Sequence, residues 1–221
     1  SDVYKRRLKR RWFAPSKLKK KAFFSESCKG VYTPCWTYDA QTRTNYRGRR
    51  GDYYYVTVGS GDKKRSERRT RWSSASGVVP VFFDDVLVPA SKMLPQKIIT
   101  NMERSWDMNN LVEMDTRFMS GFLTEKYAVK LKDGFDIAKE KMYPQIKSAI
   151  QRDIGGDTQE ISSHTTTYSA IKFKLILLPV YMSSYTYKNK LYHFYVNGRT
   201  GKVVGDRPYS AAKIILFILS L

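Results

Sequence analysis

Apolar and polar residues alternate along most of this chain, a period typical of β-strands that are buried on one face. The clearest example lies in residues 30–57, where two aromatic runs flank a basic segment that contains Gly48 and Gly51. A weaker copy of this arrangement occupies residues 178–198. Each copy places a proline two residues before an aromatic ring and ends in a second aromatic run. The pattern therefore predicts two aromatic hairpins and suggests an internal duplication.

Further strands are predicted at residues 123–131, 161–168 and 171–184, because charged or small residues alternate there with apolar ones. A short helix is predicted from Pro95. The residues that follow it, 109–122, have the composition of loops and turns and are expected to pack through Leu111, Phe118 and Phe122. Asn197-Gly198 and Thr200-Gly201 predict a final hairpin turn before residues 202–204, and these elements complete a chain in which strands predominate.

Apolar residues recur at helical spacing in three other stretches. Residues 2–13 and 16–25 predict two basic amphipathic helices, which suit an anionic surface and equally suit an arm packed on a domain. Residues 133–154 predict a central helix that ends at a Gly-Gly pair, with Pro144 kinking it or dividing it in two. The apolar stripe of this helix consists of Phe135, Ala138, Met142, Ile146 and Ile150.

The last residues, 211–221, become almost wholly apolar from Ile214 onward. A bilayer-spanning helix takes about 20 residues, so this run is too short to cross a membrane by itself. We interpret it as the start of a transmembrane helix; a C-terminal core helix is the alternative.

The predicted fold is an α+β protein of antiparallel, aromatic-rich sheets with a central helix, basic N-terminal helices and the start of a C-terminal transmembrane helix. Four regions follow from this pattern: a helical arm at 1–27, a first β-rich unit at 28–131, the helix with a second β-rich unit at 132–210, and an anchor at 211–221. A chain of 221 residues is long enough to bury a core of this kind.

The formal net charge of +20 changes the functional picture, because a protein so far from neutrality attracts polyanions such as nucleic acid or anionic lipid. The basic residues cluster in residues 1–22 and 43–72, and the second cluster interleaves arginine with aromatic rings, as single-stranded nucleic-acid platforms do. Solvated surface charge and ordinary cross-strand pairs are the alternatives. The candidate polyanion-binding residues are Arg6, Arg7, Arg10, Arg11, Lys19, Lys20, Lys21, Arg43, Arg47, Arg49, Arg50, Tyr53, Tyr55, Arg69, Arg71 and Trp72.

The sequence carries no catalytic signature, and we expect no enzyme. Cys28 and Cys35 are predicted to be packing residues, since they and two distant histidines do not supply the spacing of a zinc site. The segment GRTGK at 198–202 is too short for a phosphate loop. Adjacent carboxylates at Asp84 and Asp85 point to opposite faces of a regular strand, so an enzyme that uses them or Asp107 is the least favoured interpretation.

Six segments in order resemble a family of uncharacterised bacterial zinc-ribbon (TFIIB-type zinc finger) proteins, some of which are labelled primosomal protein or helicase. The resemblance covers nearly the whole chain. Its segments are RRWFAPSKLKKKA (10–22), GVYTPCWTYDA (30–40), YRGRRGDYYYVT (46–57), FFDDVLVPASK (82–92), RDIGGD (152–157) and VNGRTGKVVGDRPYSAAKI (196–214).

The resemblance implies zinc ribbons before this region and transmembrane helices after it, so zinc is expected only in the ribbons and no cofactor in this part. It also implies a location at the bacterial cytoplasmic membrane, facing the cytoplasm, and a role as adaptor for PspA-type or SPFH-like proteins in envelope stress. Where relatives have an aromatic residue this chain has Cys35, and the nucleotide-binding motifs of a helicase are not found.

Together these observations predict a non-enzymatic, membrane-tethered scaffold or adaptor within a larger assembly. Its basic face would meet anionic lipid or an acidic protein partner. The alternative is a nucleic-acid-binding module, as the primosomal label of some relatives suggests.

Overall fold

A computed structural model describes residues 23–24, 28–59, 61, 64–103, 105–106, 108–210 and 213. Strands make up 56% of these residues and helices 22%, so the described chain is mainly antiparallel β-sheet. The predicted α+β class is therefore corrected to a mainly β fold, with two α-helices among the described residues. The expected basic helices at 2–13 and 16–25 lie outside the described residues, except that Phe23 and Phe24 form a strand where a helix was predicted.

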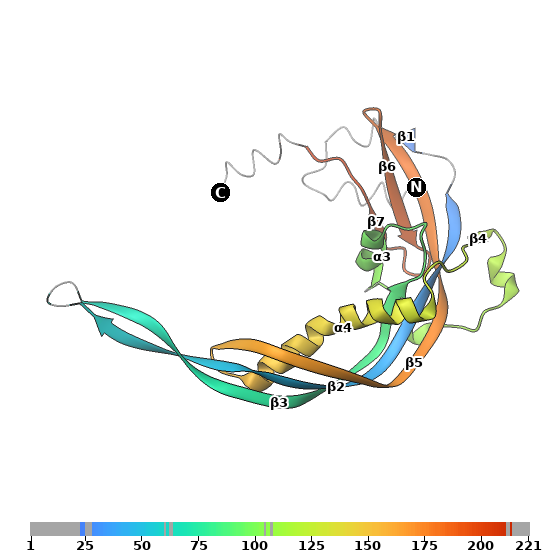
Figure 1. Cartoon of the computed structure of the whole chain (residues 1–221). Coiled ribbons are helices and arrows are strands. Elements are labelled where there is room, and N and C mark those ends of the chain that lie inside the picture. The colour runs from blue at the N-terminus through green and yellow to red at the C-terminus, as the bar shows by residue number, and fades with distance from the viewer. Residues whose placement is uncertain are drawn as a thin grey trace. The chain divides into compact units, whose positions relative to one another are not determined.

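One sheet connects the strands in the order β3-β2-β5-β6-β7 (Figure 1). The short strand β1 pairs with β5 in antiparallel fashion, and β4 pairs with β2 in parallel. The strands are β1 (Phe23–Phe24), β2 (Lys29–Val58), β3 (Arg65–Pro89), β4 (Phe122–Thr124), β5 (Thr158–Tyr187), β6 (Lys190–Asn197) and β7 (Val203–Gly205). The helices are α3 (Gln96–Glu103) and α4 (Leu131–Ile154), with 3-10 turns η2 (Met108–Asn110) and η3 (Thr116–Met119).

The predicted hairpin at residues 30–57 is wrong, because these residues form a single strand, β2. Its glycines serve close packing instead of a turn. A Cβ at Gly48 would collide with the carbonyl oxygen of Glu160, and one at Gly51 would lie 2.5 Å from Thr158 Cγ2. The second aromatic copy does form a hairpin, β5–β6. The two copies therefore have different structures, and the suggested internal duplication is wrong.

The described residues fall into two compact units, each assembled from separate segments of the chain. The first draws on the described residues within Ser1–Cys35, Pro89–Lys130 and Leu175–Leu221, and the second on those within Trp36–Val88 and Leu131–Lys174. Each of the long strands β2, β3 and β5 contributes residues to both units.

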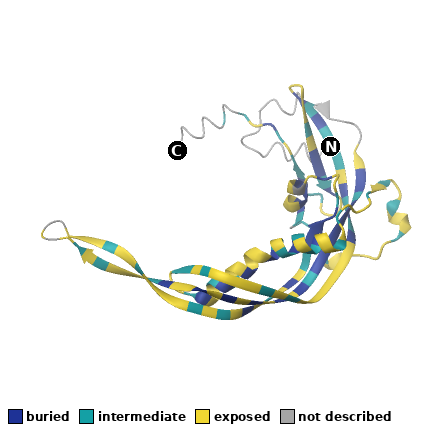
Figure 2. Cartoon of the chain, viewed as in Figure 1, coloured by how far each residue is buried: buried dark blue, intermediate teal, exposed yellow. Residues whose placement is uncertain are grey.

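In the second unit, α4 packs its apolar stripe against the sheet. Ala138, Met142, Ile146 and Ile150 are fully buried, as the helical spacing predicted, and the helix continues through Pro144 as one element. The start of the helix is fixed by Tyr38, whose hydroxyl donates a hydrogen bond of 2.7 Å to the carbonyl of Leu131. Figure 2 shows the buried positions of this unit gathered where α4 lies along the strands.

In the first unit, α3 covers the β5–β6–β7 part of the sheet. Its apolar residues Ile98, Ile99 and Met102 pack against Val180 and Tyr195. This helix forms where the sequence predicted it. The predicted strand at 123–131 is wrong beyond Thr124, since the next residues form a loop in which the Ala128 N–H donates to the Ala90 carbonyl at 2.7 Å.

Within the described ranges, no helix combines the length and the apolar character that crossing a membrane requires. This finding corrects the predicted membrane location. The run at 211–221, apart from Lys213, lies outside the described residues.

Candidate interaction sites

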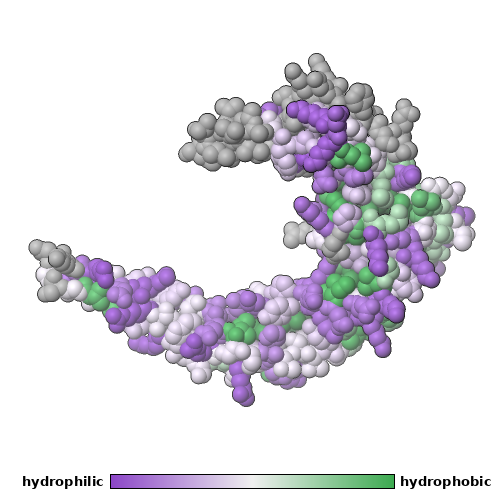
Figure 3. Space-filling model, turned by 45° about the horizontal axis from the view of Figure 1, so that its top comes forward, coloured by the Kyte–Doolittle hydropathy of each residue, from purple (hydrophilic) through white to green (hydrophobic). Residues whose placement is uncertain are grey.

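The candidate residues of the second basic cluster lie on the hairpin formed by β2 and β3 in the second unit. From Ala40 to Arg49, alternate residues of β2 are buried and exposed. Arg43, Arg47 and Arg49 belong to the exposed set, because side chains of a strand alternate between its two faces. Figure 3 shows hydrophilic residues over much of the visible surface of this hairpin. These three arginines are therefore exposed on one face of the hairpin, and their predicted role in binding a polyanion stays a prediction.

Three arginines of this hairpin lie over aromatic rings. Arg49 lies 5.0 Å from the ring centre of Trp72, and Arg68 lies 4.3 Å from that of Tyr53. A third pair, Arg71 with Tyr54, has a separation of 5.3 Å. Exposed pairs of this kind contribute about 0.5–1 kcal/mol each. They place guanidinium groups beside aromatic rings along the hairpin.

Sequence reasoning missed Arg68 and Tyr54. The available signal was their place within the same alternating runs as the residues that were selected. Tyr55, which was selected, is 70% exposed and is the most exposed ring of the Tyr53–Tyr55 run.

Carboxylates offset part of this positive charge. Arg50 pairs with Asp52 at 3.0 Å, and Arg69 pairs with Glu67 at 3.6 Å. Arg49 pairs with Glu160 at 2.5 Å. All these groups are about half exposed, so each pair stabilises the fold by at most about 1 kcal/mol. The hairpin therefore keeps a net positive charge but is less basic than its arginine count indicates.

The seven candidates of the first basic cluster lie outside the described residues. They are Arg6, Arg7, Arg10, Arg11, Lys19, Lys20 and Lys21. Their predicted role stays a prediction.

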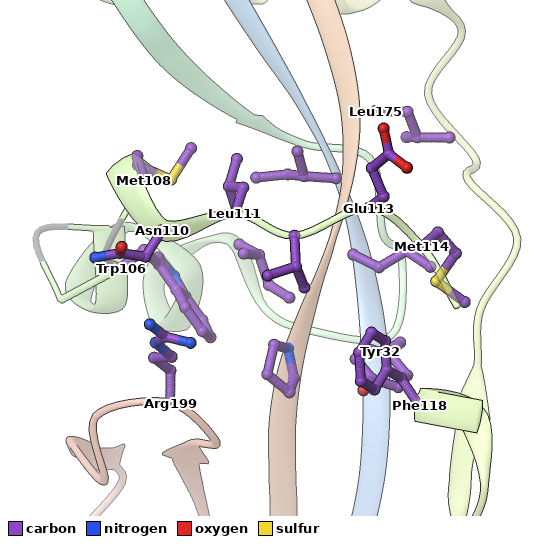
Figure 4. Close-up of a pocket in the computed structure, with 15 residues that line it drawn as sticks. Tyr32, Trp106, Met108, Asn110, Leu111, Glu113, Met114, Phe118, Leu175 and Arg199 are labelled. Carbon is purple, nitrogen blue, oxygen red and sulfur yellow. The ribbon is translucent and has the colours of Figure 1, made fainter. Parts of the chain in front are cut away.

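A second candidate site, here called the apolar pocket, lies in the first unit and has a volume of about 470 Å³. Its walls come from Tyr32 of β2, from residues 106–118 and from residues 175–179 of β5, with Arg199 of the β6–β7 turn. Figure 4 shows Tyr32 and Phe118 on one side of the pocket and Trp106 and Arg199 on the other. Most of these residues are apolar, so the pocket suits an apolar group.

The rim of the apolar pocket exposes large apolar side chains to solvent. Val112 is 72% exposed and Met114 is 53% exposed, and Leu111, Phe118 and Leu175 are also exposed. Figure 3 shows apolar residues on the visible surface toward the side where η3 lies. Exposed apolar clusters of this kind mark sites of protein or ligand binding.

Sequence reasoning treated residues 109–122 as a loop that packs through Leu111, Phe118 and Phe122. Phe122 does pack, with its ring centre 4.8 Å from that of Tyr32. Leu111 and Phe118 instead remain exposed at the pocket. The run LVEM at 111–114 was the available signal. A loop has no regular face that packs against a core, so three apolar residues within it are expected to be partly exposed.

Three carboxylates also converge in the second unit, those of Asp39, Asp84 and Asp85, with oxygens within 4.8 Å of one another. The expectation that Asp84 and Asp85 point to opposite faces is wrong, because Asp85 has a φ of 49° and interrupts the alternation of β3. The Asp85 N–H donates to Asp39 Oδ1 at 2.9 Å, and Lys174 Nζ donates to Asp85 Oδ1 at 3.0 Å. The hydrogen bond to Asp85 raises the pKa of Lys174, so the ammonium stays charged and offsets the acidic group.

The remaining residues considered for chemistry lie in separate places. Cys35 is buried, as predicted for a packing residue, whereas Cys28 is exposed. The ring of His164 stacks on that of Tyr143 with centres 5.1 Å apart. Asp107 lies outside the described residues.

The chain is similar to the uncharacterized protein YdjG of Bacillus subtilis (strain 168). The two are 28% identical over 219 residues, which cover 93% of this chain and 60% of the relative, so the chain spans less than two thirds of that protein's length. No family model matches the chain, and no solved structure matches it. The resemblance to the bacterial zinc-ribbon family therefore stays a prediction.

Proposed function

We propose that this chain is a non-enzymatic adaptor that binds an acidic protein segment through the apolar pocket. The observation that carries the proposal is the combination of an open apolar cavity with a rim of exposed apolar side chains. The partner segment inserts one or two apolar side chains into the cavity, and its acidic residues lie against the basic surface of the chain.

The apolar contribution is large enough to matter. Full burial of one valine or methionine side chain is worth about 1.5–3 kcal/mol. Val112 and Met114 are each more than half exposed, so a partner that covers both gains a large part of that amount from each. A few anchors of this kind carry most of the binding energy in protein interfaces.

The charge of the chain favours an acidic partner over a neutral one. The net charge is +20, whereas the lining of the apolar pocket holds one acidic and one basic residue, Glu113 and Arg199, so the preference rests on the charge of the chain as a whole. Electrostatic attraction raises the association rate and disfavours basic partners. The resemblance to zinc-ribbon proteins points to PspA-type or SPFH-like proteins as the first partners to test.

The experiment is a selection of displayed peptides of random sequence on the immobilised chain. The proposal predicts enriched peptides that combine large apolar residues with flanking Asp or Glu. It also predicts that Val112→Asp weakens binding of such a peptide by about tenfold or more, equal to about 1.4 kcal/mol.

The matched control is Ile171→Asp, which places the same charge at an exposed apolar residue in the other unit. Both variants should keep the melting temperature of the parent, and only Val112→Asp should lose the peptide. Enrichment of basic peptides, or equal loss in both variants, would refute the proposal.

A second candidate function is binding of single-stranded nucleic acid by the β2–β3 hairpin. The exposed array of arginines and rings supports it, because bases stack on aromatic rings while guanidinium groups contact phosphates. Its test is the affinity for a single-stranded oligonucleotide measured over a range of salt, which should fall steeply as salt rises.

The variant for this second test is Arg47→Gln with Arg71→Gln, and its charge-matched control is Lys132→Gln with Lys147→Gln on α4. Loss of affinity in the first variant alone would support the nucleic-acid function. Equal loss in both would show only general attraction to the positive charge.

A further inference from the structure

A second cavity in the first unit, here called the basic pocket, has a volume of about 730 Å³ and is separate in its lining from the apolar pocket. Its walls come from α3, from the start of β6, from Lys202 and β7, and from residues 206–209. A volume of this size is typical of small-molecule sites, which measure about 300–1,000 Å³. The cavity is thus large enough for an organic ligand.

Four cationic side chains line the basic pocket: Lys97, Lys190, Lys202 and Arg207. Asp206 is the one acidic residue in the lining that the structure describes, so these side chains sum to a charge of +3 (four minus one). Lys97 belongs to α3 and the other three come from the last part of the described chain, about a hundred residues later. The fold, and not a basic run in the sequence, brings them to one cavity.

The surrounding backbone holds these residues in defined positions. Lys202 Nζ donates a hydrogen bond of 2.7 Å to the carbonyl of Asn101, which ties the β6–β7 turn to α3. The Asp206 N–H donates to the carbonyl of His193 at 3.0 Å, which fixes the start of the segment that carries Arg207. The apolar contacts of α3 with Val180 and Tyr195 hold in place the helix that carries the exposed Lys97. Two of the four cations, Lys97 and Lys190, belong to α3 and β6, whereas Lys202 and Arg207 lie in the segments that flank β7 and are held by these hydrogen bonds.

Aromatic side chains add a second kind of contact. Tyr192 and Tyr209 line the basic pocket, and Tyr209 is 57% exposed. Arg207 lies 5.0 Å from the ring centre of Tyr209, and Lys190 lies 5.7 Å from that of Tyr192. These pairs place each ring beside a cation, an arrangement that accepts a ligand with both an anionic and an apolar part.

From these features we infer that the basic pocket binds a small phosphorylated ligand whose phosphate groups carry more than one negative charge. Lysine ammonium groups act as point charges for phosphate oxygens, and arginine donates two parallel hydrogen bonds to them. A single monovalent anion would leave most of the positive charge unmatched, whereas a diphosphate group matches it. This inference is independent of the adaptor function, because no residue is shared between the linings of the two pockets.

The test is calorimetric titration of the chain with inorganic pyrophosphate, with inorganic phosphate and chloride salts as weaker competitors. The expected result is saturable binding of one pyrophosphate per chain. Lys97→Gln with Lys202→Gln should weaken that binding by about tenfold or more, because two charge-assisted contacts are lost.

The control is Lys132→Gln with Lys147→Gln, which removes the same charge from exposed positions on α4 in the other unit. This variant should keep its pyrophosphate affinity within about twofold. Since Lys202 also contacts Asn101, Lys190→Gln with Arg207→Gln provides a second pocket variant, and the melting temperature of each variant checks the fold. No saturable binding, or equal weakening in the pocket and control variants, would overturn the inference.

A second experiment distinguishes two sources of the ligand, a phosphorylated lipid headgroup and a free phosphorylated molecule. The same variants are mixed with vesicles of phosphatidylcholine that contain phosphatidic acid, and binding is measured by sedimentation. Vesicle binding that is lost in the pocket variants and kept in the control would identify a phosphorylated headgroup. Pyrophosphate binding without such vesicle binding would identify a free phosphorylated molecule. Either result supports the site.

Discussion

Replacement of Gly48 by alanine tests the packing of β2 against β5 directly. The added Cβ would collide with the carbonyl oxygen of Glu160 and would lie 3.2 Å from Ile154 Cδ1. The oxygen belongs to the backbone, so the collision is relieved only if the two strands move apart. Overpacking of a tight site costs about 1–3 kcal/mol.

The sign of the effect discriminates between interpretations. Without a close contact, Gly48→Ala in a strand would stabilise the fold by about 0.5–1 kcal/mol, because alanine loses less backbone entropy on folding. The structure predicts that the collision outweighs this gain and lowers the free energy of unfolding by up to about 2.5 kcal/mol.

The assay is urea unfolding followed by circular dichroism. Asn45→Ala is the control, since Asn45 is exposed on the same strand, and its effect should stay within about 0.5 kcal/mol. A free energy of unfolding for Gly48→Ala that equals or exceeds that of the parent would contradict the close packing of β2 and β5.

Two further predictions concern the same unit. Ile146→Ala should lower the free energy of unfolding by about 2–5 kcal/mol in urea, because the side chain is fully buried, whereas the exposed Lys147→Ala should change it little. Stability should fall between pH 10 and about 12, because burial raises the pKa of Tyr38 to about 12, and burial with the hydrogen bond to Asp153 raises that of Tyr46 to about 12. The unfolded chain loses these protons near pH 10 while the folded chain keeps them, so Tyr46→Phe should reduce the alkaline loss measured by urea titration across that range.

The sequence predicted those elements whose pattern of apolar residues or turn residues is contained within one short segment. Four of the five residues predicted for the stripe of α4 are buried, namely Ala138, Met142, Ile146 and Ile150. Phe135 is only partly buried, and the helix also buries Gly134 and Ile154, which the spacing did not indicate. The hairpin turn at Asn197 and Gly198 also followed from local signals, and β6 and β7 pair on either side of it. In both cases the information lies within a few residues of the chain.

The long strands could not be predicted in the same way. Glycine is a signal of a turn and equally of close approach between strands, and only contacts distant in sequence decide between the two. Gly48 illustrates this, because its neighbour Glu160 lies more than a hundred residues away. Gly48 and Gly51, which the sequence placed in a turn, therefore lie within the strand β2.

The candidate sites divide in the same way. The arginines and rings of the β2–β3 hairpin were visible because they lie close together in the sequence. The apolar pocket was not, because it combines Tyr32, residues 106–118 and residues 175–179. No local pattern links these segments, and they meet only in the fold.

The most direct test of the adaptor function is a map of where a selected acidic peptide binds. Methyl resonances of the chain are recorded by nuclear magnetic resonance as the peptide is added. The account predicts that the largest shifts fall on Leu111, Val112 and Met114 and leave Ile171 unchanged. Shifts confined to the β2–β3 hairpin would contradict it, because they would show that the peptide binds to the positive charge of the hairpin and not to the apolar pocket.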